Sequence, residues 1–359
     1  MKFIALTSSL SNEWDNLVRV SDDAWVFHLY DWLELEEKVW DLEPKSFLVE
    51  HDGRTIGIVP LQMHKRHRAL KSDFRGCSGV ALINGLDGAF RERALKEIYQ
   101  HIELIAKENN SPSIEIYLPP LAESQLKDPW QVNPLILHYY TDISTHTFIL
   151  DLKKDQEAII AGLSKDARLQ MRKAQDSGYT IRQATGVEGY YQVHCENYRR
   201  TGVDPHPKEY FVGIFEKICK AGHAQLWEAL DPSGEPVAFE MIAFFKKKAF
   251  YWTACCKDGH LESGVNYLLQ IHSMIWAHQQ GAQYFETGEA FPNAREGKEK
   301  GLTIFKEKFG GQLHRFLKGR LVAPGGKANA FKSWVQASKA LLNQLLLREN
   351  APDVDTGRN

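Results

Sequence analysis

The same order of secondary-structure signals occurs twice in this 359-residue chain. In the first half, strand-like residues 46–50 and 55–61 flank a short turn that contains glycine, which predicts a β-hairpin. In the second half, residues 224–229 and 236–244 flank a turn with proline and glycine, which predicts a second hairpin. Because self-similarity along a chain indicates repeated architecture, we expect two related units.

A long helix and a short strand are predicted after each hairpin. In the first half, the helix covers about residues 91–107 and the strand residues 113–118. In the second half, an apolar helical face precedes Gly281, a helix stop, and residues 282–286 form the strand. That face consists of Val265, Leu268, Ile271 and Ile275. The pattern predicts an α/β (α+β) fold of two units, each a mainly antiparallel sheet flanked by helices.

Prolines between residues 119 and 146 interrupt helix and strand alike, which predicts a linker between the two units. The predicted domains are therefore residues 1–140 and residues 141–325. Residues 326–359 follow as a tail, in which residues 328–347 have the spacing of an amphipathic helix.

The charge balance and the cysteines exclude several classes of protein. The net charge of −2 argues against a general nucleic-acid binder and against DNA as a partner. The five cysteines form no CxxC pair and no His/Cys ladder, so no metal is expected and the thiols are expected to be reduced in a cytoplasmic protein. Neither a signal peptide nor a transmembrane segment is predicted. The basic runs at residues 65–68 and 246–248 are expected to be solvated hairpin tips.

Residues 305–311 read Phe-Lys-Glu-Lys-Phe-Gly-Gly and are the strongest candidate for chemistry. Phe305 and Phe309 are four residues apart, so they share one helical face while Lys306 points off that face. A fixed ammonium can stabilise a phosphate or a developing oxyanion. The glycine pair ends the helix and allows close backbone approach. The alternative is an ordinary helix end with a solvated lysine.

A second candidate is the basic helix predicted over residues 164–178. Ser164 is suited to the N-cap position. Lys165, Arg168 and Arg172 share one face at helical spacing, and such a stripe can hold phosphates. The alternative is a solvated helix face.

Taken in order, these features resemble the FemAB family and the related BioF-like acetyltransferase domains, which are built from tandem GNAT-like units. The resemblance covers about residues 147–322, with a weaker echo in the first half. Besides the basic helix and the hairpin, the matching pieces are Tyr198-Arg199-Arg200-Thr201-Gly202, Tyr210-Phe211, Phe250-Tyr251-Trp252-Thr253-Ala254, Gly264-Val265-Asn266, Gln280-Gly281, Phe285-Glu286-Thr287-Gly288 and the Phe-Lys motif.

The resemblance implies acyl transfer to an amine. The donor would be an acyl-CoA carrying an acetyl or similar group, and the acceptor an amino sugar or a cell-envelope precursor. The alternative is transfer from aminoacyl-tRNA to a peptidoglycan precursor. Either acceptor is a small or lipid-linked sugar or peptide, so peripheral contact with a membrane is compatible with both. A non-catalytic module, which would bind a ligand without transferring a group, is the alternative of a different class.

The resemblance also implies roles for individual residues. Lys306 would lie near the reacting acyl group. The substrate-binding positions would be Arg200 and Tyr251. We also predict substrate binding by Arg168 and Arg172 of the basic stripe and by Asn266 and Phe305 of the matching motifs.

Acyl transfer to an amine also requires a proton acceptor, because the attacking amine must lose a proton. Glu240, Glu286 and Glu289 are the carboxylates nearest to the motifs in the predicted strands. We predict Glu240 as the catalytic carboxylate; for each of the three, a structural ion pair is the alternative.

Overall fold

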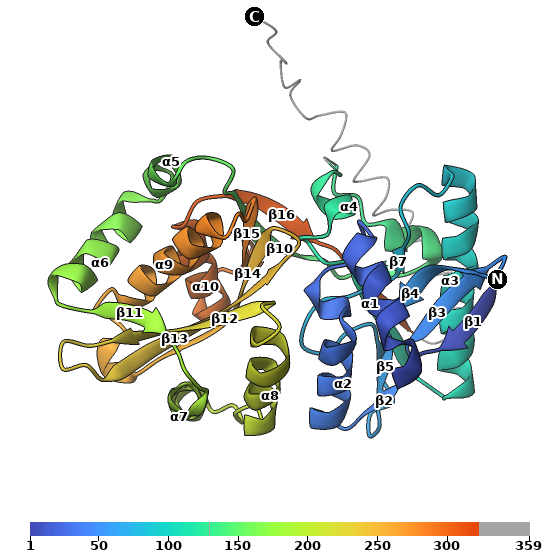
Figure 1. Ribbon diagram of the computed structural model, residues 1–359, viewed down its shortest axis with the longest axis horizontal. Helices are drawn as coiled ribbons and strands as arrows, with labels where there is room; N and C mark the ends of the chain where they lie inside the picture. Colours follow the sequence, from blue (N-terminus) through green and yellow to red (C-terminus); the bar gives the residue numbers. More distant parts are fainter. Residues whose placement is uncertain (129, 323–359) are drawn as a thin grey trace, which may run out of the picture.

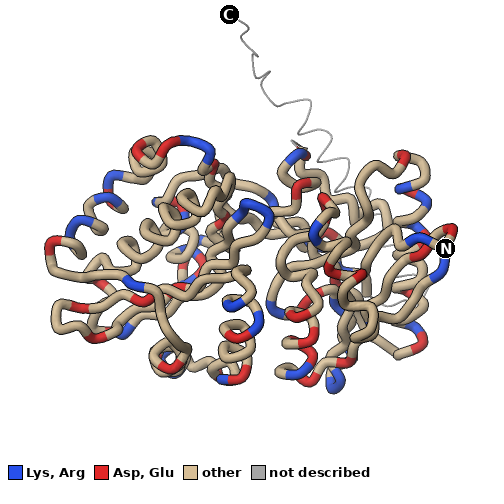
Figure 2. The backbone as a smooth tube through the Cα atoms, viewed as in Figure 1, with Lys and Arg blue, Asp and Glu red and all other residues tan. Residues whose placement is uncertain are grey.

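Three β-sheets and the helices around them form two α/β halves (Figure 1). The computed structural model describes residues 1–128 and 130–322, so the helix predicted over residues 328–347 lies outside the described residues. Cationic and anionic residues are interspersed along both halves (Figure 2), in agreement with the near-neutral net charge.

The N-terminal half contains two sheets and one long helix. The four-stranded sheet has the order β1 (Lys2–Ala5), β3 (Phe47–His51), β4 (Arg54–Val59) and β7 (Ala81–Leu82). The six-stranded sheet has the order β2 (Leu42–Pro44), β5 (Gln62–His64), β6 (Leu70–Lys71), β8 (Ser113–Tyr117), β17 (Lys318–Val322) and β9 (Thr141–Asp142). The helices are α1 (Ser11–Val20), α2 (Tyr30–Val39), α3 (Gly88–Glu108) and the short α4 (Glu123–Leu126).

The C-terminal half is built on one seven-stranded sheet. Its order is β11 (Thr180–Gln183), β12 (Ala224–Leu230), β13 (Pro236–Phe245), β14 (Lys248–Cys256), β15 (Tyr284–Ala290), β10 (Thr145–Asp151) and β16 (Gln312–Phe316). The helices are α5 (Gln156–Ala161), α6 (Lys165–Asp176), α7 (Glu188–Thr201), α8 (Lys208–Gly213), α9 (Val265–Gln279) and α10 (Gly297–Glu307).

Both predicted hairpins are confirmed, as β3–β4 and β12–β13, and both pairs are antiparallel. The predicted helices are α3 and α9, and each lies between two strands that pair in parallel: β6 with β8, and β14 with β15. A parallel pair needs a crossover connection, which the helix supplies. The two halves therefore repeat one β-α-β arrangement, and the predicted mixed α/β fold is confirmed.

The end of the described chain returns to the first half. After β16 the chain crosses over (orange-red in Figure 1), and β17 inserts between β8 and β9 of the N-terminal six-stranded sheet. The predicted division into residues 1–140 and 141–325 stays a prediction. The strand pairing adds that β9 and β17 share a sheet with strands of the first unit.

Aromatic side chains join the two halves. Phe27, in a short helix before α2, makes edge-to-face contacts with Phe250 and Trp252 of β14, at centroid distances of 5.8 and 5.1 Å. Phe27 also contacts Trp32 of α2 at 5.1 Å. These rings belong to one core that spans both halves, so the relative placement of the halves depends on apolar packing.

The basic run at residues 246–248 reinforces this junction, and its prediction as a solvated tip is wrong. Lys246 donates to the carbonyl oxygens of Ser21 and Ala24 in the first half, at 2.7 and 3.0 Å. Lys248 is buried and forms an ion pair with Glu123 at 2.8 Å. The run lies at the turn before β14, which packs against the first half, so Lys246 and Lys248 reach protein oxygens, while Lys247 at the tip is exposed.

Replacement of Phe27 tests the junction. Phe27→Ala should lower the free energy of unfolding by about 3–5 kcal/mol, because it removes a buried ring and leaves a cavity between the halves. Urea denaturation measures this loss. The control is Val20→Ala on α1, where the side chain is 62% exposed and a change within about 0.5 kcal/mol is expected. Equal losses for both variants would contradict the role of Phe27.

Candidate active site

The seven-stranded sheet opens where β14 and β15 diverge. The two strands pair in parallel only from Lys248–Tyr284 to Phe250–Glu286. The register between β13 and β14 shifts at this point and leaves Trp252 opposite no residue of β13, which is a β-bulge. Bulges bend a strand and occur frequently beside active sites. The backbone of β14 beyond Phe250 thus faces a wedge between the two strands.

Lys306 enters this wedge from α10. Its side chain is only 7% exposed, and Nζ donates to the carbonyl oxygen of Glu289 at 2.7 Å. Nζ lies 5.9 Å from the centroid of the Tyr251 ring. Phe305 and Phe309 pack together at a centroid distance of 4.9 Å. The alternative of a solvated lysine is therefore wrong.

Burial and two carboxylates set the charge of the site. Burial lowers the pKa of Lys306 to about 8, and the nearby Glu286 and Glu289 oppose that shift. Burial raises the pKa of Glu286 to about 7, and Thr147 and Lys306 oppose that shift. Burial would raise the pKa of Glu289 as well, but the ion pair with Lys318 lowers it overall. Lys306 and Glu286 therefore titrate close to neutral pH, as acid–base groups do.

Residues of both halves line the cleft at which Lys306 lies. A cavity of about 250 Å³ is bounded by Arg75 and Cys77 of the first half and by Glu286 and Lys306 of the second. A neighbouring cavity of about 380 Å³ shares Arg75 with it, and its further lining is rich in aromatic rings. These rings belong to Phe74, Tyr117, Tyr198, His206, Tyr210, Trp252 and Phe316. The cleft can hold a ligand larger than the reacting group.

A third cavity, of about 210 Å³, brings four of the predicted site residues together. Glu240, Tyr251, Asn266 and Phe305 line it, and Tyr251 also lines the cleft cavity beside Lys306. Glu240 is 1% exposed, and its Oε1 atom has no hydrogen-bond partner among the described residues. Burial raises the pKa of Glu240 to about 8. The Tyr251 side chain thus lies between a cavity with Lys306 and a cavity with Glu240.

The three predicted arginines line none of these three cavities. Ser164 caps α6 as predicted, but Arg168 donates to the carbonyl oxygens of Ala161 and Leu163, which closes the corner between α5 and α6. Arg172 is exposed on α6. Arg200 forms an ion pair with Asp258 at the end of α7. Roles of Arg168, Arg172 and Arg200 in binding stay predictions.

Sequence reasoning missed the residues that the first half contributes. Arg75 and Cys77 line the cleft cavity, and Tyr117 lines its aromatic extension. Arg75 had one sequence signal, because it precedes Gly76 in a turn-like segment. Long-range packing of the two halves brings it opposite Lys306, and no local pattern reports such packing.

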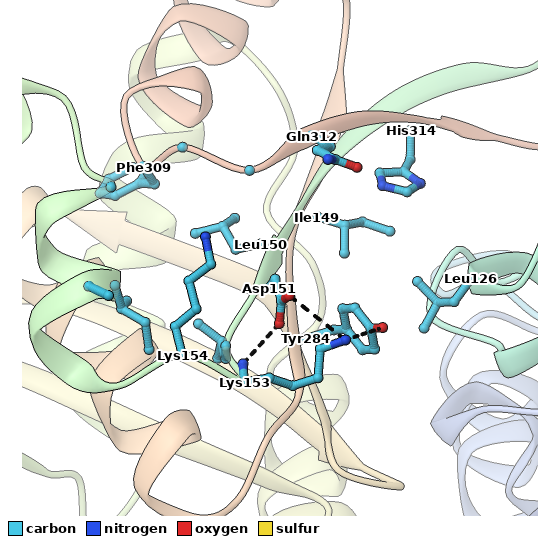
Figure 3. A pocket seen from close by; sticks show the side chains of 16 residues that line it. Leu126, Ile149, Leu150, Asp151, Lys153, Lys154, Tyr284, Phe309, Gln312 and His314 are labelled. Atoms are coloured by element: carbon cyan, nitrogen blue, oxygen red, sulfur yellow. Dashed lines mark hydrogen bonds and ion pairs between the residues drawn. The ribbon is translucent and has the colours of Figure 1, made fainter. Parts of the chain in front are cut away.

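A further cavity, of about 570 Å³, is lined by Phe309 of the motif together with residues of β10 and α5 (Figure 3). Lys154 points into it, and Lys153 lies between Asp151 and Tyr284. Its lining includes Gly310 and Gly311, which belong to the Phe-Lys motif. A β-carbon on Gly311 would lie 2.8 Å from the carbonyl oxygen of Ile149, so the predicted close backbone approach is confirmed and serves packing. Because Lys306 does not line this cavity, we place the chemistry in the cleft.

Two searches of the described chain bear on other classes of site. Between residues 1 and 128 and between 130 and 322, no three His, Cys, Asp or Glu side chains are grouped so that they could hold a metal ion. In the same residues, no helix has the length and apolar composition needed to cross a membrane.

Comparison with known proteins places this geometry in a class. Residues 162–299 match the family model of the acetyltransferase (GNAT) domain. A structure of a protein named FemX is similar, with 15% identity, 90% of this chain and 97% of that chain covered, and a TM-score of 0.65. A tandem GNAT protein from the clavulanic acid biosynthesis pathway is similar at 14% identity, with 91% and 99% covered and a TM-score of 0.56.

The C-terminal domain of a putative lysylphosphatidylglycerol synthetase from Agrobacterium fabrum is also similar, at 14% identity, with 93% and 97% covered and a TM-score of 0.55. No curated protein matches the sequence. The class defined by the fold and the domain is thus an acyltransferase. More particularly, residues 162–299 match the acetyltransferase (GNAT) domain, and the chain has a tandem GNAT-like fold, as the resemblance implied.

Gly288 tests the placement of the ammonium. Its φ of +76° disfavours any side chain, and a β-carbon there would lie 3.1 Å from Nζ of Lys306. Gly288→Ala should therefore lower the free energy of unfolding by about 1–2 kcal/mol and reduce acyl transfer. Denaturation and a transfer assay measure the two effects. Gly186→Ala is the control, since nothing lies within 4 Å of its β-carbon position. Unchanged stability and activity in Gly288→Ala would show that Nζ lies elsewhere.

Proposed function

We propose that the protein transfers an acyl group from acyl-CoA to an amine of an acceptor held in the cleft between its halves. The observation that carries this proposal is the buried Lys306 beside Glu286, at the point where the cleft reaches the divergence of β14 and β15. A buried ammonium and a carboxylate with a pKa near neutral are the two groups that acyl transfer to an amine requires.

In this mechanism, Glu286 accepts the proton that the acceptor amine loses as it attacks the thioester carbonyl. Negative charge then develops on the carbonyl oxygen, and the Lys306 ammonium stabilises it electrostatically. Collapse of the tetrahedral intermediate breaks the carbon–sulfur bond and leaves the amide, and the thiolate takes up the proton that Glu286 accepted, which restores the carboxylate. Glu240, predicted as the catalytic carboxylate, lies beyond Tyr251, so Glu286 is better placed for this step.

The reacting carbonyl of the donor would lie beside Lys306 in the cleft cavity, and the part of the donor next to that carbonyl would extend past Tyr251 into the cavity that Glu240 lines. Glu240 also favours the second candidate donor, aminoacyl-tRNA. A buried carboxyl group with an unpartnered oxygen can pair with the α-ammonium group of an aminoacyl donor, whereas an acetyl group has no donor for it.

The acceptor is proposed to be an amino sugar or a small or lipid-linked cell-envelope precursor. The two connected cavities of the cleft and their aromatic rings support a ligand with a flat or sugar-like part. The proposed location of the reaction is the cytoplasm, where acyl-CoA and aminoacyl-tRNA are made.

Replacement of Lys306 tests the mechanism. Lys306→Met keeps the length of the side chain without its charge, so it should reduce kcat at least 100-fold through lost stabilisation of the oxyanion. The melting temperature should not fall, because the replacement removes a buried charge and keeps the packing. The measurement is acyl transfer by the purified variant. A matched control is Lys308→Met, two residues further along the chain at the end of α10, which removes a partly exposed ion pair with Asp166. Equal activity losses in both variants would contradict a catalytic role for Lys306.

Thermal unfolding in the presence of two probe ligands distinguishes the two candidate donors, acyl-CoA and aminoacyl-tRNA. A ligand that binds the native state raises the melting temperature. Acetyl-CoA should raise it, and Glu240→Gln should leave that shift intact. If the donor is aminoacyl-tRNA, a non-hydrolysable aminoacyl-adenosine amide should raise it instead, and Glu240→Gln should abolish that shift. Absence of both shifts would contradict the proposed donor cavity.

A further inference from the structure

A buried carboxylate shapes the loop that enters the cleft from the first half. Asp73 is fully buried, and its Oδ1 atom accepts hydrogen bonds from the backbone N–H groups of Arg75 and Gly76, at 2.9 and 2.5 Å. Its Oδ2 atom accepts a hydrogen bond from Nε1 of Trp32 at 3.3 Å. Three donors from two segments therefore fix the backbone conformation at residues 73–76.

A second buried carboxyl group, Glu36 of α2, lies beside Asp73. Burial and the charge of Asp73 hold the pKa of Glu36 well above its usual range, and burial raises the pKa of Asp73 to about 6. Two adjacent buried carboxyl groups do not both ionise, because their charges repel. Glu36 therefore stays protonated and leaves Asp73 as the ionised acceptor for the loop.

The same loop is pressed against the junction between the halves. A β-carbon on Gly76 would lie 2.5 Å from the ring of Phe27, the residue that packs against Phe250 and Trp252. The position of the loop is thus tied to the position of the second half. The Arg75 side chain leaves this rigid loop towards both cleft cavities.

Arg75 forms no ion pair with a carboxylate among residues 1–128 and 130–322. Its guanidinium group lies 4.0 Å from the centroid of the Trp40 ring. The other two cations of the cleft are compensated: Lys318 pairs with Glu289, and Lys306 bonds to a carbonyl oxygen beside Glu286. Stacking on an indole ring covers one face of a guanidinium group and leaves its N–H edge available.

We propose that Arg75 is an anion-binding residue that takes an oxyanion of the acceptor, a phosphate or a carboxylate, in the aromatic part of the cleft. The identification of this ligand as the acceptor rests on the proposed function; the anion site itself does not. A guanidinium edge offers two parallel N–H groups to such an oxyanion, which forms a charge-assisted bidentate contact.

The aromatic residues around Arg75 are suited to a ligand in which the anion is attached to a flat group. His206 lines the same cavity, and burial, with the charge of Arg75, lowers its pKa to about 4, so the imidazole is neutral at pH 7. Trp40 packs against His206 and against Tyr210 at centroid distances of 5.3 and 5.7 Å. An oxyanion at Arg75 would place the neighbouring part of the ligand against these rings, within reach of Lys306 in the connected cavity.

The test is anion binding by the purified full-length protein at low ionic strength. Inorganic pyrophosphate and succinate serve as the phosphate and carboxylate probes, and calorimetry gives Kd for each. At least one probe should bind to the wild type, and Arg75→Gln should weaken that binding 10- to 100-fold, as expected for a lost charge-assisted contact. Arg75→Lys should give an intermediate loss of affinity, because it keeps the positive charge but not the two parallel N–H groups of the guanidinium. The matched control is Arg93→Gln, which removes an exposed arginine stacked on Phe90 of the same half, and it should bind like the wild type.

Each result decides the inference. Arg75-dependent binding of pyrophosphate supports a phosphate on the ligand, and Arg75-dependent binding of succinate supports a carboxylate. Equal binding by Arg75→Gln and the wild type, equal losses in Arg93→Gln, or no binding of either anion would overturn the site. Because these assays need no transfer, Arg75-dependent binding by a protein without transferase activity would overturn the proposed function and leave the anion site standing.

Discussion

The packing of Phe27 against Phe250 and Trp252 determines where every group of the proposed site lies. These contacts join the first half to β14, the strand that diverges from β15 and opens the wedge for Lys306. They also hold the loop that carries Arg75 against the junction. A cleft with one wall from each half is therefore a consequence of an apolar interface, in which edge-to-face rings add orientation to the area that they bury.

Within the cleft, burial shifts the pKa values of Lys306 and Glu286. Removal from water makes the Lys306 ammonium less stable and the neutral form of Glu286 more stable, and the attraction between the two groups limits both shifts. The divergence of β14 and β15 and the bulge at Trp252 create the space in which this pair faces the cavity. The surface charge pattern has no such effect, since opposite charges alternate along both halves.

The sequence predicted the elements better than the site. Hairpins, the helix α9 and the cap at Ser164 follow from local patterns of apolar residues, turns and caps, so they were recognised. The arginines of α6 share a face as predicted, but Arg168 is used to close a helix corner. The position of Arg75 in the cleft and the pairing of β17 with the six-stranded sheet of the first half depend on contacts between segments far apart in the chain. No local period in the sequence encodes such contacts.

The proposed chemistry depends on Lys306, which is buried beside two carboxylates and whose pKa is lowered to about 8 in the folded protein. The rate at which an acylating reagent modifies Lys306, followed by mass spectrometry as a function of pH, measures the pKa of its amine directly, because only the free amine reacts. The account predicts a rate that rises with pH and levels off above about 8. A rate that keeps rising until the pH reaches about 10.4, the ordinary pKa of lysine, would contradict a buried catalytic ammonium. It would make Lys306 a solvated surface residue.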